Sequence, residues 1–332
     1  MRIRAALIPS LLVASTLIVT GCSGSSSDAS AGTSRSTPTT VEVTASSTTL
    51  PKTTEVAGSQ LKGDVAFLGP IRTVKVGKNR LAFRQFGKGP DLVLIAGQAS
   101  PMSLWPATTF LAPLAKDHRV TIYDNRDLGG SSNSGDFTLS DLADDGAGLI
   151  AALGLHKPAV FGWSTGGEIG LLLAIRHPGS IGSLATTGAT PGGPKSVLAP
   201  EKVNALFADP TPDTNALFDV LFSPSGAKAK DAFLKDYVRV PQGDVSPAAT
   251  ASYDKAERAY WAAPEPDLAS IDVPVLVMNG SADYAVPPAN ATYIASRIGH
   301  GTKVELDDGG RHAWFLEHPD HFLQALATFL KQ

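Results

Sequence analysis

The chain has 332 residues and a formal net charge of −3, with 43% hydrophobic and 18% charged residues. This balance is typical of a globular protein, and the length allows one large α/β domain or two small ones with tails. The near-neutral charge gives no electrostatic reason to expect a nucleic acid as a partner.

The first residues, 1–21, have the layout of an export signal. Basic MRIR is followed by apolar AALIPSLLVASTLIV and then by TGC. The apolar run is shorter than the about 20 residues of a membrane-spanning helix, which argues against a spanning anchor. Val19-Thr20-Gly21-Cys22 resembles the lipobox of bacterial lipoproteins. The resemblance implies cleavage before Cys22, a lipid on that residue and anchoring to the outer face of the cell membrane, with simple secretion as the alternative.

Residues 22–64 are predicted to form a flexible tether. They are rich in Ser and Thr, as in SGSSSDASAGTSRSTPTT, and lack apolar periodicity. Such a segment cannot bury enough apolar surface to offset the entropy lost on ordering. Cys22 is the only cysteine, so no intramolecular disulfide can form. The folded body is expected over residues 65–332.

The body alternates between predicted strands and helices. A hairpin is expected over 72–86. Strands then fall at 91–97, 119–124, 159–163 and 181–188, separated by helices at 105–116, 138–154 (with Ser140 at or near its start) and 168–177. This β-α-β-α order predicts an α/β fold with a mostly parallel sheet covered by helices on both faces.

The alternation stops over about residues 190–271, which are interpreted as a small helical cap that sets substrate choice. Its Phe, Leu, Tyr and Trp residues suggest an apolar pocket for an acyl or alcohol group, or they simply pack the cap onto the body. Afterwards the alternation resumes with a strand at 273–280, a helix at 290–298, a strand at 302–306 and a closing helix from residue 319.

The stretch GWSTGG at 162–167 follows a predicted strand and precedes a helix. A loose turn is one explanation, but this context fits G-x-S-x-G, in which a serine nucleophile sits on a strained strand-to-helix turn. A phosphate-binding loop would need a Gly-Lys-Ser/Thr ending, which is missing. Ser164 is therefore the predicted nucleophile.

A serine needs a base, and the base needs a group that orients it. In this arrangement an acid and then a histidine follow the serine in the chain, each on a loop after a strand. Asp283 and His312 meet both conditions. Asp124 comes too early in the chain, whereas Asp307 and Asp308 share a loop with His312. The remaining histidines fail on order or position, and His318 and His321 are interpreted as surface residues.

The oxyanion of the reaction needs two N–H donors near the nucleophile. The backbone of Thr165, which follows Ser164, is the predicted first donor. The backbone of Gln98, in the loop after the strand at 91–97, is the predicted second donor, although AGQAS could also be an ordinary turn.

Five segments together resemble the α/β-hydrolase superfamily, in its esterase, lipase and cofactor-free haloperoxidase branch. They are DLVLIAGQASPMSLW, VTIYDNRDLGGSS, VFGWSTGGEIGL, VPVLVMNGSADYAVPP and GGRHAWFLEHPDHF. The chain departs from many relatives at Ala96-Gly97, where they have His-Gly, and at Asp127, where they often have Gly. Dehalogenase and epoxide-hydrolase relatives use an Asp nucleophile, so Ser164 argues against both activities.

The resemblance implies a serine hydrolase for a small-molecule carboxylic ester, with an amide or thioester as variants and water as second substrate. Perhydrolysis or a lyase reaction at the same site is the first alternative, and an inactive surface binding protein is the second. No metal or organic cofactor is expected, because the sequence has neither H-E-x-x-H nor a cysteine cluster.

Overall fold

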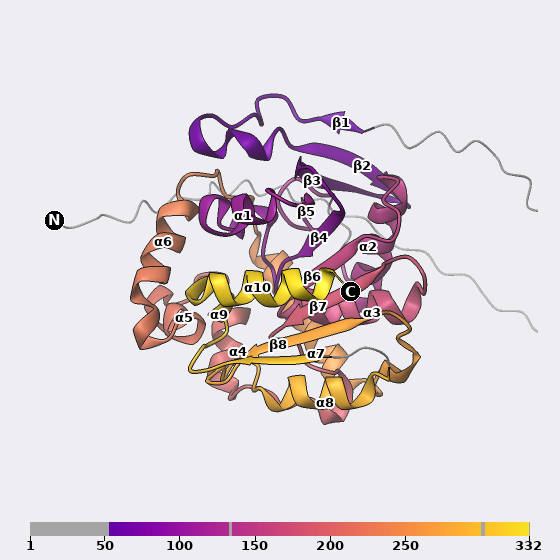
Figure 1. Ribbon diagram of the computed structural model, residues 1–332, viewed down its shortest axis with the longest axis vertical. Helices are drawn as coiled ribbons and strands as arrows, with labels where there is room; N and C mark the ends of the chain where they lie inside the picture. The colour runs from indigo at the N-terminus through magenta and orange to yellow at the C-terminus, as the bar shows by residue number, and fades with distance from the viewer. Residues whose placement is uncertain (1–52, 133–134, 300–302, 332) are drawn as a thin grey trace, which may run out of the picture. The chain divides into compact units, whose positions relative to one another are not determined.

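A nine-stranded sheet is the centre of the computed structural model, which describes residues 53–132, 135–299 and 303–331. The strand order is β1-β2-β3-β5-β4-β6-β7-β8-β9 (Figure 1). β1, β2, β3 and β5 pair antiparallel, and the strands from β5 to β9 pair parallel. The strands are β1 (Thr54–Glu55), β2 (Arg72–Val76), β3 (Asn79–Gly87), β4 (Asp91–Ile95), β5 (Arg119–Tyr123), β6 (Ala159–Trp163), β7 (Ser183–Thr187), β8 (Val275–Gly280) and β9 (Lys303–Asp307). The predicted parallel α/β architecture is confirmed.

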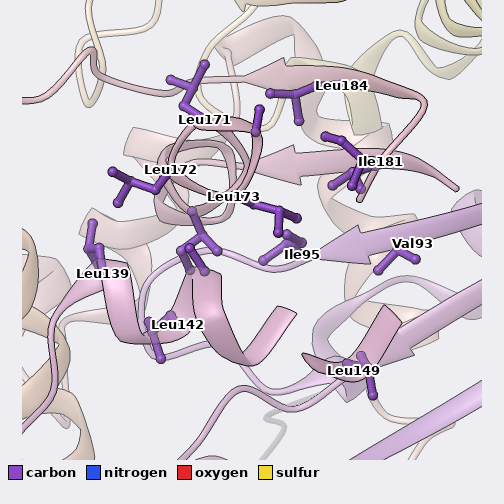
Figure 2. Close-up of a cluster of buried hydrophobic side chains, with 14 of the residues drawn as sticks. Val93, Ile95, Leu139, Leu142, Leu149, Leu171, Leu172, Leu173, Ile181 and Leu184 are labelled. Atoms are coloured by element: carbon purple, nitrogen blue, oxygen red, sulfur yellow. The ribbon is translucent and has the colours of Figure 1, made fainter. Parts of the chain in front are cut away.

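Helices cover both faces of this sheet. Those of the body are α1 (Ala112–Leu114), α2 (Leu139–Ala152), α3 (Thr165–Arg176), α8 (Ala289–Arg297), α9 (Trp314–Glu317) and α10 (Pro319–Leu330). Val93 and Ile95 of β4 pack with leucines of α2 and α3 (Figure 2), whereas Leu92 and Leu94 belong to the core on the side of α1 and α10. Successive side chains of a strand point to opposite faces, so a continuous apolar strand supplies two cores.

Four further helices lie within the predicted cap at 190–271, in the chain between β7 and β8. They are α4 (Glu201–Ala208), α5 (Thr214–Leu221), α6 (Ala227–Tyr237) and α7 (Pro247–Ala262). α7 packs against both α4 and α2, so the cap is in contact with the body as well as with itself. In the part of the chain that the structure describes, no helix combines the length and apolar character needed to cross a membrane.

Three local features differ from the sequence prediction or refine it. The helix expected at 105–116 is a π-helical turn, Ala107–Leu111, followed by the short α1, and both Phe110 and Leu111 donate to Pro106 O. Ser140 is the second residue of α2, whose N-cap is Thr138. Asp127, where relatives often have Gly, takes the left-handed φ of 67°.

The folded chain also starts before residue 65, where the folded body was predicted to begin. β1 pairs with β2, and Ser59 Oγ accepts a hydrogen bond of 2.8 Å from Ile71 N. The predicted export signal at 1–21, Cys22, the first part of the tether and His300 lie outside the described residues.

Candidate active site

Ser164 lies on the turn between β6 and α3, in a backbone conformation that residues other than glycine rarely adopt. Its φ is 58° and its ψ is −128°. The glycines around it allow the turn to close: a Cβ at Gly162 would lie 2.2 Å from Gly166 O, and one at Gly166 would lie 2.1 Å from Ile95 O. Strain of this kind persists only where the surrounding structure imposes it and is concentrated at functional sites. The turn therefore has the geometry expected for a nucleophile at a helix N-terminus.

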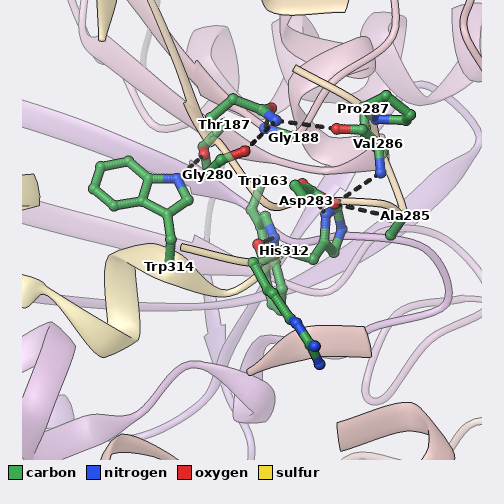
Figure 3. Close-up of polar contacts among 12 residues, drawn as sticks. Trp163, Thr187, Gly188, Gly280, Asp283, Ala285, Val286, Pro287, His312 and Trp314 are labelled. Atoms are coloured by element: carbon green, nitrogen blue, oxygen red, sulfur yellow. Dashed lines mark hydrogen bonds and ion pairs between the residues drawn. The ribbon is translucent and has the colours of Figure 1, made fainter. Parts of the chain in front are cut away.

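Asp283 and His312 meet at the same edge of the sheet, on the loops that follow β8 and β9. The distance from His312 Nδ1 to Asp283 Oδ2 is 2.9 Å, and both side chains are buried. The other carboxyl oxygen, Oδ1, accepts from Ala285 N and Val286 N at 2.9 Å each (Figure 3). Trp163 Nε1 donates to His312 O at 3.0 Å. A carboxylate at Nδ1 keeps the proton there and leaves Nε2 as the basic nitrogen.

The competing aspartates have other partners. Asp307 is buried and contacts His318 Nδ1 at 2.5 Å and His321 Nδ1 at 2.8 Å, while Asp308 is exposed. Asp124 accepts from Met102 N and Gly130 N at 2.7 and 2.9 Å, and burial raises its pKa to about 6. Thus the carboxylate that the structure brings to His312 is the one at Asp283. His318 and His321, predicted as surface residues, are half-exposed, and both contact the carboxylate of Asp307.

Ser164 and His312 line one cavity of about 240 Å³, together with Gln98 and Trp163. Most of its remaining wall is apolar, and the cap supplies Leu206, Phe207, Leu217 and Leu221. A narrow polar extension of about 30 Å³ also touches Ser164 and His312 and reaches Asn204, Asp254, Glu257 and Trp261. Among the described residues, no hydrogen bond joins Ser164 Oγ to His312, and such contacts often tighten only when substrate is bound.

The predicted oxyanion donors flank Ser164. In the described ranges, the N–H groups of Gln98 and Thr165 donate to no protein acceptor. The loop of Gln98 folds back at Ser100, whose N donates to Gly97 O at 3.2 Å, and Gly97 lies so close that a Cβ there would be 3.2 Å from Ser164 Cβ. Gln98 lines both parts of the cavity. Two free donors next to the serine suit a developing oxyanion.

One pair of residues beside the site was not singled out from the sequence. Glu168 of α3 and Glu257 of α7 are both buried, and Thr165 Oγ1 donates to Glu257 Oε1 at 2.6 Å. The only sequence signal was an acid in the otherwise apolar start of a helix. Within the described parts of the chain, no group of three or more His, Cys, Asp or Glu side chains could hold a metal ion. The expectation that the protein uses no metal stays a prediction.

Comparisons with known proteins agree with this fold. Residues 92–325 match the sequence profile of the alpha/beta hydrolase family. A pimeloyl-[acyl-carrier protein] methyl ester esterase of Aeromonas hydrophila is 26% identical over 263 residues, which cover 75% of this chain and 99% of the relative. The enol-lactonase of Burkholderia xenovorans LB400 superposes with a TM-score of 0.65 at 26% identity, over 78% of this chain and 100% of that one. A bromoperoxidase of Bacillus anthracis, at 22% identity, shares the fold with a TM-score of 0.64, over 79% of this chain and 100% of that one.

Proposed function

The chain belongs to the alpha/beta hydrolase family, and we propose that it is a serine hydrolase that cleaves a carboxylic ester with the triad Ser164, His312 and Asp283. One observation carries the proposal. Ser164, in its strained conformation, and His312 line one cavity, and the buried Asp283 contacts His312 Nδ1 at 2.9 Å, although the three residues come from three different loops. A nucleophile, a base and an orienting acid in this relation are the requirements of acyl transfer.

In the proposed reaction, Ser164 Oγ attacks the ester carbonyl while His312 Nε2 takes the hydroxyl proton. The N–H groups of Gln98 and Thr165 donate to the carbonyl oxygen as it becomes negative, and Asp283 stabilises the imidazolium. The tetrahedral intermediate expels the alcohol, which receives the proton from His312. Water then attacks the acyl-enzyme by the same route, releases the acid and restores Ser164.

We infer that the group next to the scissile bond is apolar and uncharged. The cap side chains Leu206, Phe207, Leu217 and Leu221 lie in the wall of the cavity of about 240 Å³. Burying such a group stabilises the complex by about 25 cal/mol per Å² of apolar surface, whereas a charge would lose its hydration there. A panel of esters with graded acyl length would locate the best fit.

Covalent labelling tests the proposed nucleophile. A fluorophosphonate should label the wild type, and Ser164→Ala should lose the label and several orders of magnitude in kcat, with a residual rate from the oxyanion donors. Ser100→Ala is the matched control, because Ser100 lines the same cavity and should not be needed. Labelling that survives in Ser164→Ala, or an unlabelled wild type, contradicts the proposal. Product analysis with and without hydrogen peroxide separates hydrolysis from perhydrolysis.

We also propose that the protein is exported and anchored by lipid on Cys22, as its lipobox-like VTGC segment suggests. One acyl chain gives only marginal membrane binding, so stable anchoring requires at least two. The wild type should therefore incorporate labelled fatty acid and sediment with membranes, and Cys22→Ser should do neither. A wild type that takes up no label contradicts the lipid anchor and leaves simple secretion.

A further inference from the structure

Two carboxyl groups are buried near the candidate nucleophile, where carboxylates are rare. Glu168 is in the first turn of α3, and Glu257 projects from the cap helix α7. They are 2% and 7% exposed. Glu257 also lines the polar extension of the cavity, together with Ser164 and His312. The pair thus joins the cap to the residues of the proposed reaction.

The hydrogen bonds around the pair leave room for one shared proton. Glu168 Oε1 accepts from Thr190 Oγ1 at 2.5 Å, from Thr190 N at 3.4 Å and from Trp261 Nε1 at 3.3 Å. Glu168 Oε2 is buried and has no conventional donor among the described residues. The pKa of each carboxyl is shifted by the other, which places the two groups within interaction distance. A proton on Glu257 supplies the missing donor, because an ionised carboxylate can only accept.

The electrostatic surroundings favour keeping that proton. Burial raises the pKa of both carboxyls, and the charge of Glu168 raises the pKa of Glu257 further. Asp254, one turn earlier on α7, acts in the same direction. The described residues provide no ion-pair partner for either carboxyl. The nearby titratable groups are Asp254, Arg258 and Tyr260 of α7, Glu201 of α4 and His312. Arg258 forms its ion pairs with Glu201 and Asp254.

We propose that Glu257 is a positioning residue for hydrolysis at Ser164: as a carboxylic acid that shares its proton with Glu168, it holds Thr165 and the start of α3 against the cap. This inference rests on the proposed function, since Thr165 N–H is the proposed oxyanion donor. On one side, Glu257 accepts a hydrogen bond from Thr165 Oγ1. On the other side, Glu168 accepts one from Thr190 Oγ1. Thr190 comes two residues after Gly188, which lies against the ring of His312. One proton therefore orders two sides of the reaction centre.

The bridge makes activity depend on pH in a defined direction. A carboxyl with a raised pKa keeps its proton near neutral pH and loses it as the pH rises. Loss of the proton places two buried carboxylates side by side, and their repulsion pushes α7 away from α3. The value of kcat/KM should therefore fall on the alkaline side, where His312 is already neutral and competent as a base.

The test compares pH profiles of kcat/KM with a neutral nitrophenyl ester. Glu257→Gln should keep the neutral-pH rate, because its amide oxygen can accept from Thr165 and its amide N–H can donate to Glu168, and it should lose the alkaline fall. Glu257→Ala should lose about tenfold in kcat/KM at neutral pH, the equivalent of one hydrogen bond. Glu201→Gln, another carboxyl-to-amide change on the cap, should keep the wild-type profile.

Two outcomes overturn the inference: an alkaline fall that is unchanged in Glu257→Gln, or a neutral-pH rate in Glu257→Gln as low as in Glu257→Ala. Infrared spectroscopy provides a readout that needs no activity. The carbonyl band of a buried protonated carboxylic acid should be present in the wild type at pH 7 and missing in Glu257→Gln, and its absence from the wild type refutes the shared proton. Failure of the proposed function would appear separately, as a Ser164 that no fluorophosphonate labels.

Discussion

Asp283→Asn is the sharpest test of the proposed triad, because the structure fixes how the new amide must lie. Ala285 N and Val286 N both donate to Oδ1, so the amide oxygen has to stay in that position. The amide nitrogen then replaces Oδ2, 2.9 Å from His312 Nδ1. Its N–H donates to Nδ1 and forces the ring proton onto Nε2, so the base can no longer accept the serine proton.

The expected loss is about 10⁴-fold in kcat, or about 5.5 kcal/mol of transition-state stabilisation. Stability should change little, by about 1 kcal/mol, because both backbone hydrogen bonds survive. The assay is kcat on a nitrophenyl ester together with a thermal melt. Asp307→Asn is the matched control: Asp307 is equally buried but contacts His318 and His321, so kcat should stay within about tenfold, as it should in Asp308→Asn. A normal rate in Asp283→Asn, with loss in Asp307→Asn, would refute the assignment.

Three further changes probe the surroundings. Gly188→Ala would place a Cβ 2.8 Å from His312 Cε1 at a φ of +61°, so kcat should drop at least tenfold while the melt shows a folded protein. Phe207→Ala opens the apolar wall beside His312. Across an acyl series, it should lower kcat/KM for the best substrate about tenfold more than for the acetate ester. The ring nitrogens of His321 hydrogen-bond to the carboxylates of Glu305 and Asp307, which raises the pKa of His321. These bonds stabilise the folded protein fully below the pKa of His321 in the unfolded chain, about 6.5, and the stabilisation is lost as the pH rises through the higher pKa of the folded state. His321→Ala should therefore lower the melting temperature more at pH 5.5 than at pH 9.

The parallel sheet could be predicted because its strands are short apolar runs that alternate with amphipathic helices. Val93 and Ile95 face one core, and Leu92 and Leu94 face the other. The continuous apolar run in DLVLI therefore indicates a strand that is buried on both faces. The convergence of Ser164, Asp283 and His312 was predictable for a related reason. Carboxyl ends of parallel strands share one edge, and side chains on the loops there converge whatever their distance in the chain.

Long-range pairing explains what the sequence did not predict at the amino end. Thr54–Glu55 has no apolar pattern, and it becomes a strand only because β2 offers a free edge. Ser59 likewise accepts a hydrogen bond from the distant Ile71, in addition to its local bonds to Val56. The π-helical turn at Ala107–Leu111 depends on Pro106 O accepting from two residues, which no periodicity rule reveals.

The carboxyl pair was hidden for a different reason. An acid in the first turn of a helix, such as Glu168, is a common partner of the helix dipole, and Glu257 lies in the polar stretch DKAERAY, where a solvent-exposed side chain is expected. Contacts between distant segments enclose the two acids: Thr165 with Glu257, 92 positions apart, and Trp261 with Glu168, 93 positions apart. Burial that arises between distant segments leaves no local signature.

This contact also limits how far the cap can change independently of the reaction. A replacement cap that lacks Glu257 would leave Thr165 Oγ1 buried without its acceptor and would remove the proposed proton donor to Glu168 Oε2. Each unsatisfied polar group costs about 1–3 kcal/mol. That cost falls on the start of α3, where the oxyanion donor lies. Substitutions in the cap that alter substrate preference should therefore keep kcat only if position 257 retains an acceptor for Thr165 and a donor for Glu168. Gln meets both conditions, whereas Ala and Leu meet neither.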